Sequence, residues 1–336
     1  MLSAIKGWPG RLSVTSPWKW ALLLFSLLSV HQILHQLHLD DRLYFWISSQ
    51  WHEGDMAPRS LLHSKFRVTI DAREVHGVND NLSGLSYDHE RGHIWAVVNN
   101  PEQLLLLDRD GRLLERYPLN GFSDVEGVAY LGDGQLLVSE ERSQALVRIQ
   151  LPDRPRTLYR DDYRALTLSI DLGGNQGFEG FDYDRRSDRL FVVKEHSPRK
   201  LYEIRGLKRS MEGDFDLEII DRQDWVEEMP VTDLSSVHFD ACTGHLMVLS
   251  DQSKMLVELD HQGKLIGYQT LLSGFAGLQD SVPQGEGMTF DEYGNLFLVS
   301  EPNLFYRFEK ADSGASDHPD TGNYQCQSGN LAEVNG

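Results

Sequence analysis

The fold is decided by the stretch Gln284-Gly285-Glu286-Gly287-Met288-Thr289-Phe290-Asp291, because similar stretches occur five times along the chain. A small polar or acidic residue leads into an apolar run and then an aspartate or a turn. A second apolar run follows, here Leu296-Phe297-Leu298-Val299. The other four openings lie at residues 82–88, 125–130, 178–184 and 234–240. A repeat of roughly 40–55 residues built of short strands is typical of a β-propeller blade.

The repeats predict an all-β chain with a single propeller over residues 65–310, built of four-stranded antiparallel sheets. Outer strands are expected at residues 113–117, 157–159, 217–220 and 265–268, whereas the last repeat has none before the polar tail. Residues 66–70 have strand character, and pairing them with the last blade would remove an open sheet edge. That count favours five blades. Six remain open, because the insertions at 153–170 and 207–230 have room for another.

Composition limits the partners of this chain. It has 336 residues and a formal net charge of −19, which repels nucleic acid and suits cations or cationic and neutral ligands. A soluble acidic surface would account for the charge equally well. Two cysteines, Cys242 and Cys326, make neither a disulfide framework nor a zinc site, and both are expected to be free thiols.

The N-terminal segment reads as a membrane anchor. Residues 17–37 are largely apolar and, at about 1.5 Å per residue, would just cross a bilayer. Basic residues precede the span and Asp40 and Asp41 follow it, which places residues 1–16 in the cytoplasm and the repeats outside. A cleaved signal peptide is the main alternative. We expect residues 38–64 to be a polar tether and residues 311–336 a polar tail.

Carboxylates recur at one point of each repeat, so a ring geometry should bring them together. Glu126, Glu179 and Glu286 each precede a glycine, and Asp124 and Asp233 stand just before two of the openings. Converging carboxylates need a bound cation or raised pKa values. An all-oxygen set favours Ca²⁺ over zinc. These five residues are therefore the candidate metal ligands, the alternative being that the glutamates cap strand ends.

A second polar set ends the second strands and could form a further shell or the channel wall: Asn99, Glu140, Glu195, Asp251 and Glu301. No nucleophile elbow, zinc-protease motif or phosphate-binding loop is present in the sequence. His76, His196 and His238 are scattered single histidines, interpreted as surface or hydrogen-bonded residues rather than bases. No catalytic residue can be named.

The Glu-Gly openings, and above all residues 284–288 with 299–308, resemble the SdiA-regulated protein family; residues 78–85 also fit. The resemblance runs from about Phe66 to Phe308. It implies an NHL-like β-propeller in a bacterial envelope protein with an N-terminal membrane segment, hence an inner-membrane anchor and a periplasmic propeller. The blade pattern is also similar to calcium-dependent lactonases, to which only Glu126, Glu179 and Glu286 carry over.

Two functions remain open at this point. One is a membrane-tethered binding scaffold with a structural Ca²⁺, facing an unknown ligand or envelope protein. The other is a Ca²⁺-dependent hydrolase of lactones or esters, in which the metal polarises a carbonyl and a carboxylate acts as base. The lack of a recognisable nucleophile or base favours the scaffold.

Overall fold

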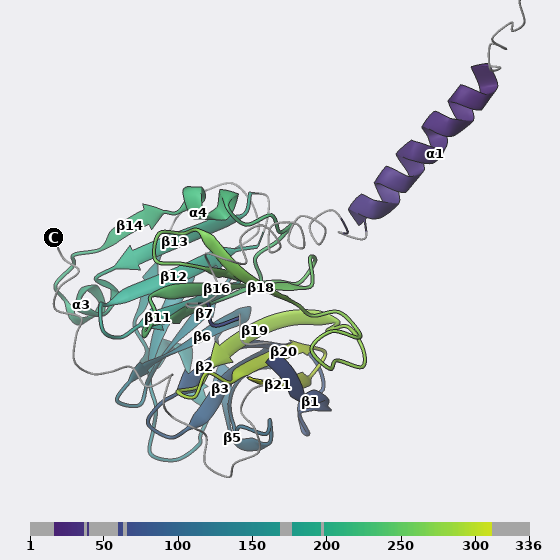
Figure 1. The fold of residues 1–336 in the computed structure, drawn as a ribbon. Helices are drawn as coiled ribbons and strands as arrows, with labels where there is room; N and C mark the ends of the chain where they lie inside the picture. The colour runs from purple at the N-terminus through teal and green to yellow at the C-terminus, as the bar shows by residue number, and fades with distance from the viewer. Residues whose placement is uncertain are drawn as a thin grey trace, which may run out of the picture.

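The computed structural model describes residues 17–36, 39, 60–62, 66–168, 177–195 and 198–310. Five antiparallel sheets form the blades of one propeller, which confirms the all-β fold and the five-blade count (Figure 1). The innermost strands contact one another in sequence around the ring, and the last contacts the first. The five repeated openings of the sequence therefore surround one central channel.

In each blade, four strands follow one another from the channel outward. Blade one contains β2 (Leu82–Asp88), β3 (His93–Asn99), β4 (Glu102–Leu107) and β5 (Leu113–Asn120). Blade two contains β6 (Val125–Gly132), β7 (Gln135–Glu140), β8 (Ala145–Gln150) and β10 (Ala165–Thr167). Blade three contains β11 (Gly180–Asp184), β12 (Arg189–Lys194), β13 (Lys200–Arg205) and β14 (Glu218–Asp221). Blade four contains β15 (Ser236–Asp240), β16 (His245–Ser250), β17 (Met255–Leu259) and β18 (Leu265–Thr270). Blade five contains β19 (Gln284–Phe290), β20 (Leu296–Glu301), β21 (Leu304–Lys310) and β1 (Phe66–Glu74).

The N-terminal strand closes the ring, as predicted. β1 pairs antiparallel with β21, beginning with Phe66 opposite Lys310, and so supplies the outer strand that the last repeat lacks. The amide of Val68 also donates to the carbonyl of Ala276, at 2.7 Å. The outer edge of β21 is thus covered by a strand from the other end of the domain.

One predicted outer strand was wrong. Residues 157–159 do not complete blade two; β9 (Leu158–Tyr159) instead pairs parallel with β5 of blade one. The outer strand of blade two is β10, paired with β8. The two insertions contain no sixth blade within the described residues; they hold β9, β10 and β14 with the short helices η1 (Arg160–Asp162), α3 (Leu207–Glu212) and α4 (Gln223–Glu227).

The core is divided into five clusters of buried apolar side chains, one between each pair of neighbouring blades. Trp95 and Tyr117 of blade one, for example, share a cluster with Val128 and Val138 of blade two. Both faces of every sheet are therefore buried, which explains why the strands read as near-continuous apolar runs. The channel itself is left to the polar residues of the innermost strands.

Glycines at the openings let neighbouring innermost strands approach closely. A Cβ on Gly84 would lie 2.6 Å from the carbonyl oxygen of Glu126, and one on Gly287 would lie 2.8 Å from the amide nitrogen of Leu85. Both contacts are to backbone, so no side-chain rotation could relieve them. The crowding expected beside the Glu-Gly pairs is confirmed, and it fixes the glutamates at the channel.

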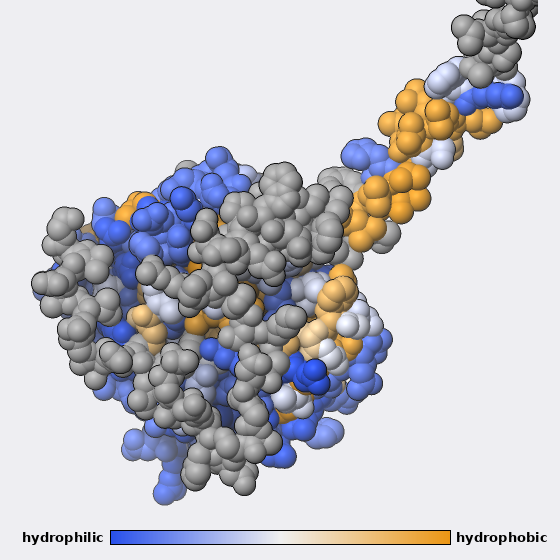
Figure 2. All heavy atoms as spheres, viewed as in Figure 1, coloured by the Kyte–Doolittle hydropathy of each residue, from blue (hydrophilic) through white to orange (hydrophobic). Residues whose placement is uncertain are grey.

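Helix α1 (Pro17–Gln36) projects from the propeller, and its apolar side chains are exposed along residues 18–34 (Figures 1 and 2). This helix coincides with the expected membrane span. Among the described residues, however, no helix combines the length and apolar character needed to cross a bilayer. The expected cytoplasmic segment 1–16 and the tail 311–336 lie outside the described residues.

The end of the expected tether is docked on blade four. Leu61 and Leu62 are each only 6% exposed and join the cluster between blades four and five. Their amides donate to the carboxylate of Glu258 at 2.9 and 3.1 Å, and the Ser60 hydroxyl donates to it at 2.5 Å. Glu258 is fully buried, and Nδ1 of His245 lies 2.7 Å from its Oε1, the oxygen that also accepts from the amide of Leu61. Residues 60–62 are thus part of the folded domain.

The cysteine expectation was wrong for Cys242, which is disulfide-bonded. It lies in the turn between β15 and β16, as expected. Turn position and polar surroundings alone do not determine the redox state of a thiol, which depends on the spatial neighbour that folding supplies. Cys326 falls outside the described residues.

Candidate metal centre at one mouth of the channel

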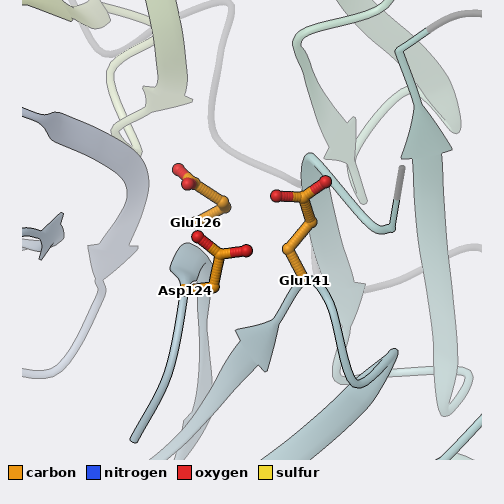
Figure 3. A group of neighbouring side chains, drawn as sticks. All are labelled: Asp124, Glu126 and Glu141. Atoms are coloured by element: carbon orange, nitrogen blue, oxygen red, sulfur yellow. The ribbon is translucent and has the colours of Figure 1, made fainter. Parts of the chain in front are cut away.

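Three carboxylates from one β-hairpin face a common space at the mouth where the innermost strands begin (Figure 3). Asp124 directly precedes β6, Glu126 is its second residue, and Glu141 directly follows β7. The two strands pair with Val125 opposite Glu140, and the amide of Glu141 donates to the carbonyl of Asp124 at 2.9 Å. The pairing register therefore brings the three side chains together.

The geometry of this group suits a cation. One oxygen from each of Asp124, Glu126 and Glu141 lies within 4.8 Å of the other two. Two oxygens on opposite sides of Ca²⁺, each about 2.4 Å from the ion, would lie about 4.8 Å apart. The donors are all hard oxygens, as Ca²⁺ prefers.

Neighbouring polar side chains orient Glu126. The Ser83 hydroxyl donates to its Oε2 at 2.8 Å, and the Asn99 amide donates to its Oε1. The same amide reaches Oδ1 of Asp124 at 3.4 Å. Blade one thus supplies the groups that hold the carboxylates of blade two, and Asn99, for which a further shell and the channel wall were both open, donates to Glu126 and Asp124.

Asp124 carries the one buried carboxylate oxygen of the group that lacks a hydrogen bond. Its Oδ2 is shielded from solvent and accepts no hydrogen bond. Nε of Arg142 lies 2.8 Å away but without hydrogen-bond alignment, and the Arg142 side chain is 78% exposed. The backbone of Asp124 is left-handed, with φ of 58°, a conformation that aspartate tolerates better than most residues. The ion pair with Arg142 is thus the contact that this buried oxygen makes in the structure.

The electrostatics of the mouth oppose full ionisation of its acids. Burial, with the nearby charges of Glu141 and Asp124, raises the pKa of Glu126 to about 7, against the effect of its hydrogen bonds. Burial and the charges of Glu141, Glu195, Glu126 and Glu286 raise the pKa of Glu179 to about 9. Burial, then the charges of Glu301, Glu126 and Asp251, raise the pKa of Glu286 to about 8, although Gln284 donates to it. The mouth therefore favours bound protons or a bound cation.

These mutual effects show where the predicted ligands lie. Glu126, Glu179 and Glu286 do share one mouth, since the charges of Glu126 and Glu286 each raise the pKa of Glu179. Glu195, Asp251 and Glu301 line the same mouth. We call this set with Asp124 and Glu141 the acidic mouth; its closely spaced group is Asp124, Glu126 and Glu141.

Asp233 lies apart from that group. It is fully buried, and its oxygens accept hydrogen bonds from the Ser250 hydroxyl and from the amides of Asp251 and Gln252, at 3.0 and 3.1 Å. These contacts hold the turn that follows β16. We therefore do not retain Asp233 among the candidate ligands.

Glu141 was missed because two adjacent glutamates end β7. The polar set expected at the strand ends contained Glu140, but the Glu140 carboxylate pairs with Nε of Arg160 at 3.0 Å and accepts from the amide of Ser123. Successive strand residues face opposite sides, so only one of the pair could face Asp124. This alternation could have identified Glu141 from the sequence, but only if the pairing register between β7 and β6 had been known.

Fold and site together define a five-bladed β-propeller with an acidic channel mouth. The model of the SdiA-regulated family matches residues 58–309, and the chain belongs to that family. The resemblance stated from the sequence is thereby confirmed.

Solved structures similar to this chain are propeller-like proteins of low sequence identity. A luciferin-regenerating enzyme is 12% identical, with a TM-score of 0.46 over 72% of this chain and 80% of that one. A streptogramin B lyase is 10% identical, with a TM-score of 0.41 over 73% and 98% of the two chains. Virginiamycin B lyase from Staphylococcus aureus is 14% identical, with a TM-score of 0.38 over 68% and 65%. At these values the similarities support no inference about activity.

Proposed function

We propose that this protein is a cell-envelope propeller that binds Ca²⁺ at the acidic mouth and serves as a scaffold for a ligand or protein partner. The main support for a bound cation is the buried Oδ2 of Asp124. This oxygen belongs to a group of three carboxylates and accepts no hydrogen bond. A cation there would satisfy that oxygen and offset the repulsion that raises the neighbouring pKa values.

The competing interpretation is that the acids only cap strand ends. Part of the geometry fits it, since Glu126 accepts from Ser83 and Asn99, and Glu141 accepts from the amide of Gly177 at 3.0 Å. A capping role does not explain why Asp124 Oδ2 stays without a hydrogen bond beside an exposed arginine. The two interpretations predict opposite effects of removing that arginine.

Calorimetric titration of the chelator-stripped full chain with CaCl₂ tests the proposal. We expect saturable binding that raises the free energy of unfolding by about 2.7 kcal/mol at a hundredfold excess over Kd. Glu126→Gln and Asp124→Asn should each weaken binding at least about tenfold, because each removes an ionised ligand. Arg142→Gln should tighten it, because the ion no longer competes with a guanidinium 2.8 Å from Asp124.

Glu218→Gln is the matched control, since that glutamate is 62% exposed on blade three and should bind Ca²⁺ as the wild type does. The absence of a titration heat at millimolar Ca²⁺, with a melting temperature that chelator does not change, would show that the acids are caps. Loss of stability in Arg142→Gln without tighter binding would point the same way.

We also propose that residues 17–37 attach the protein to the bacterial inner membrane, with the propeller in the periplasm. The exposed apolar side chains of α1 support attachment, because that surface needs a cover. Lys6, Arg11 and Lys19 before the apolar run and Asp40 and Asp41 after it support the orientation. The disulfide at Cys242 supports an oxidising compartment.

A second candidate function is hydrolysis of a lactone or ester at the same mouth. The observation in its favour is the pKa of Glu126, about 7, which suits a general base at neutral pH. A bound Ca²⁺ would polarise the carbonyl. The test is to assay the Ca²⁺-loaded protein with a panel of lactones and aryl esters. Turnover that is abolished in Glu126→Gln would establish hydrolysis. If protein shown to bind Ca²⁺ turns over none of these compounds, the hydrolase function is contradicted and the scaffold function is retained.

A further inference from the structure

The channel mouth at which the innermost strands end holds a cavity of about 1000 Å³, and residues from all five blades line it. None of the acids of the acidic mouth lines this cavity. Residues 238–242, from the end of β15 and the turn that follows, form part of its wall. Cys242, the last of them, is exposed to solvent and disulfide-bonded. A covalent bond to another segment is therefore made at the edge of the cavity.

The turn that contains Cys242 is held in place by Asp240. Oδ1 of Asp240 accepts the amide of Cys242 at 3.2 Å, and Oδ2 accepts the amide and the hydroxyl of Thr243 at 3.1 and 2.5 Å. Hydrogen bonds from one aspartate to the next residues of its own turn restrain the backbone there. The sulfur of Cys242 is thus attached to a restrained part of the cavity wall.

The disulfide partner of Cys242 follows from the sequence. The chain contains two cysteines, so the only other cysteine that it can supply is Cys326. Cys326 belongs to the polar tail, residues 311–336. A disulfide within one chain would therefore join the tail to the wall of the cavity.

The direction of β21 brings the start of the tail to the same side of the propeller. Phe308 of β21 lies opposite Leu296 of β20, and Leu296 lies opposite Phe290 of β19. Phe290 lines the cavity. Because paired residues lie side by side across a sheet, β21 ends on the side where the cavity opens.

Lys310, the last residue of β21, lies within electrostatic reach of the turn that contains Cys242. Burial lowers the pKa of Lys310, and the charges of Asp240 and Glu258 oppose that effect. From Lys310, the residues up to Cys326 could span about 50 Å when extended, at about 3.3 Å per residue. The tail is therefore more than long enough to return to Cys242.

We propose that a disulfide between Cys242 and Cys326 ties the polar tail across the rim of this cavity as a strap. The tail leaves β21 on the cavity side and returns to the cavity wall at Cys242, so it restricts access to the cavity. Because Cys242 is exposed, a dithiol can reduce the bond and release the strap. Reduction breaks the S–S bond and adds one electron and one proton to each sulfur, while the dithiol is oxidised to a cyclic disulfide.

The cross-link is tested by tryptic mapping of the full chain without reductant. Trypsin cuts after Arg222, Lys254 and Lys310, so Cys242 falls in peptide 223–254 and Cys326 in peptide 311–336. We expect these two peptides to be joined in protein that migrates as a monomer on a non-reducing gel, and dithiothreitol should separate them. Alkylation of both cysteines without prior reduction, or a cross-link found only in a disulfide-linked dimer, would overturn the proposal.

The strap is tested by the rate at which diethyl pyrocarbonate modifies His238, measured by mass spectrometry. Nδ1 of His238 lies 2.9 Å from Oδ2 of Asp182, which leaves Nε2 for the reagent. Cys326→Ser changes no residue of the propeller. In this variant, and in wild-type protein treated with dithiothreitol, modification should be at least about threefold faster than in the oxidised wild type, because the tail is no longer held beside the cavity at a high effective concentration.

Two controls separate release of the strap from other effects. Deletion of residues 329–336 keeps Cys326 and should leave the rate at His238 as in the wild type. His76 is exposed and does not line the cavity, so it should be modified at the same rate in every sample. A rate at His238 that stays the same when the cross-link is lost, or that rises together with the rate at His76, would overturn the strap.

Discussion

The aspartates that recur at the ends of the innermost strands are structural. Asp88 accepts the amides of Glu90 and Arg91, at 2.9 and 3.0 Å, and Asp184 and Asp240 accept amides of the turns that follow them in the same way. Such turns use aspartate because its short side chain can bond backbone two or three residues on. The glycine of the Glu-Gly pair is equally structural, whereas the glutamate beside it places its carboxylate at the channel mouth.

Gly84→Ala should lower the free energy of unfolding by about 1–3 kcal/mol, because the new methyl meets backbone and forces two blades apart. Its nearest contact would be the Glu126 carbonyl oxygen at 2.6 Å. Gly285→Ala is the control. There the methyl would lie 3.4 Å from a Leu249 side-chain carbon, and the free energy of unfolding should change by less than about 1 kcal/mol. Urea denaturation measures the free energy of unfolding of both variants. Equal losses in the two variants would contradict the close-approach explanation.

The acidic mouth should make the metal-free protein less stable as pH rises. The folded-state pKa values of Glu126, Glu286 and Glu179 are about 7, 8 and 9, above the ordinary value of 4.5. The folded state therefore retains protons that the unfolded state releases, so this contribution is fully present below pH 4.5 and is lost as pH rises through 7 to 9.

Scanning calorimetry in chelator should show the melting temperature falling between about pH 5 and about pH 9, with a shallower fall in Glu179→Gln. If the acidic mouth binds Ca²⁺, adding Ca²⁺ should raise the melting temperature more at about pH 8.5 than at about pH 6, because protons compete with the ion for the carboxylates. A metal-free melting temperature independent of pH in this range would contradict the electrostatic description.

Among the elements, two segments from the N-terminal side of the chain complete the propeller. β1 closes blade five against β21, and residues 60–62 lie on blade four against Glu258. Both contacts join parts of the chain that are distant in sequence, so they form only when the ring does. Closing the edge of β21 also removes a site at which another chain could pair.

Glu258→Gln should cost about 1–3 kcal/mol of stability, because the amide turns one acceptor into a donor facing other donors. Ser60, Leu61, Leu62 and His245 all contact that carboxylate. Hydrogen exchange should rise first at residues 60–62, before β1 is affected. Glu218→Gln, exposed on β14, is the control. Unchanged exchange at residues 60–62 in Glu258→Gln would show that the carboxylate does not hold the segment.

On the scale of the whole molecule, the channel has two different mouths. Carboxylates with raised pKa values surround one mouth, and a cavity of about 1000 Å³ with aromatic, acidic and basic side chains in its wall opens at the other. The strand direction of the propeller produces this division, because the first residues of every opening meet at one mouth and the last residues at the other. A single repeated motif thus supplies two mouths with different linings.

Attachment through α1 can be tested by fractionation. The full chain should remain in the membrane pellet after extraction at high salt, whereas deletion of residues 17–37 should release a folded propeller, because the apolar side chains of α1 are no longer present. A C-terminal reporter that is active only outside the cytoplasm should be active in the full-length fusion. Release of the full chain by osmotic shock, or a reporter active only in the cytoplasm, would contradict the anchored orientation.

The sequence by itself determined the repeat, and with it the five blades, their innermost strands and the convergence of Glu126, Glu179 and Glu286. These follow from local pattern, because a motif repeated in every blade must form a ring. It could not choose between Glu140 and Glu141, place β10, or reveal the disulfide at Cys242. Only the tertiary structure decided these points and joined Asp182 to His238, since strand register and contacts between blades depend on parts of the chain far apart in sequence.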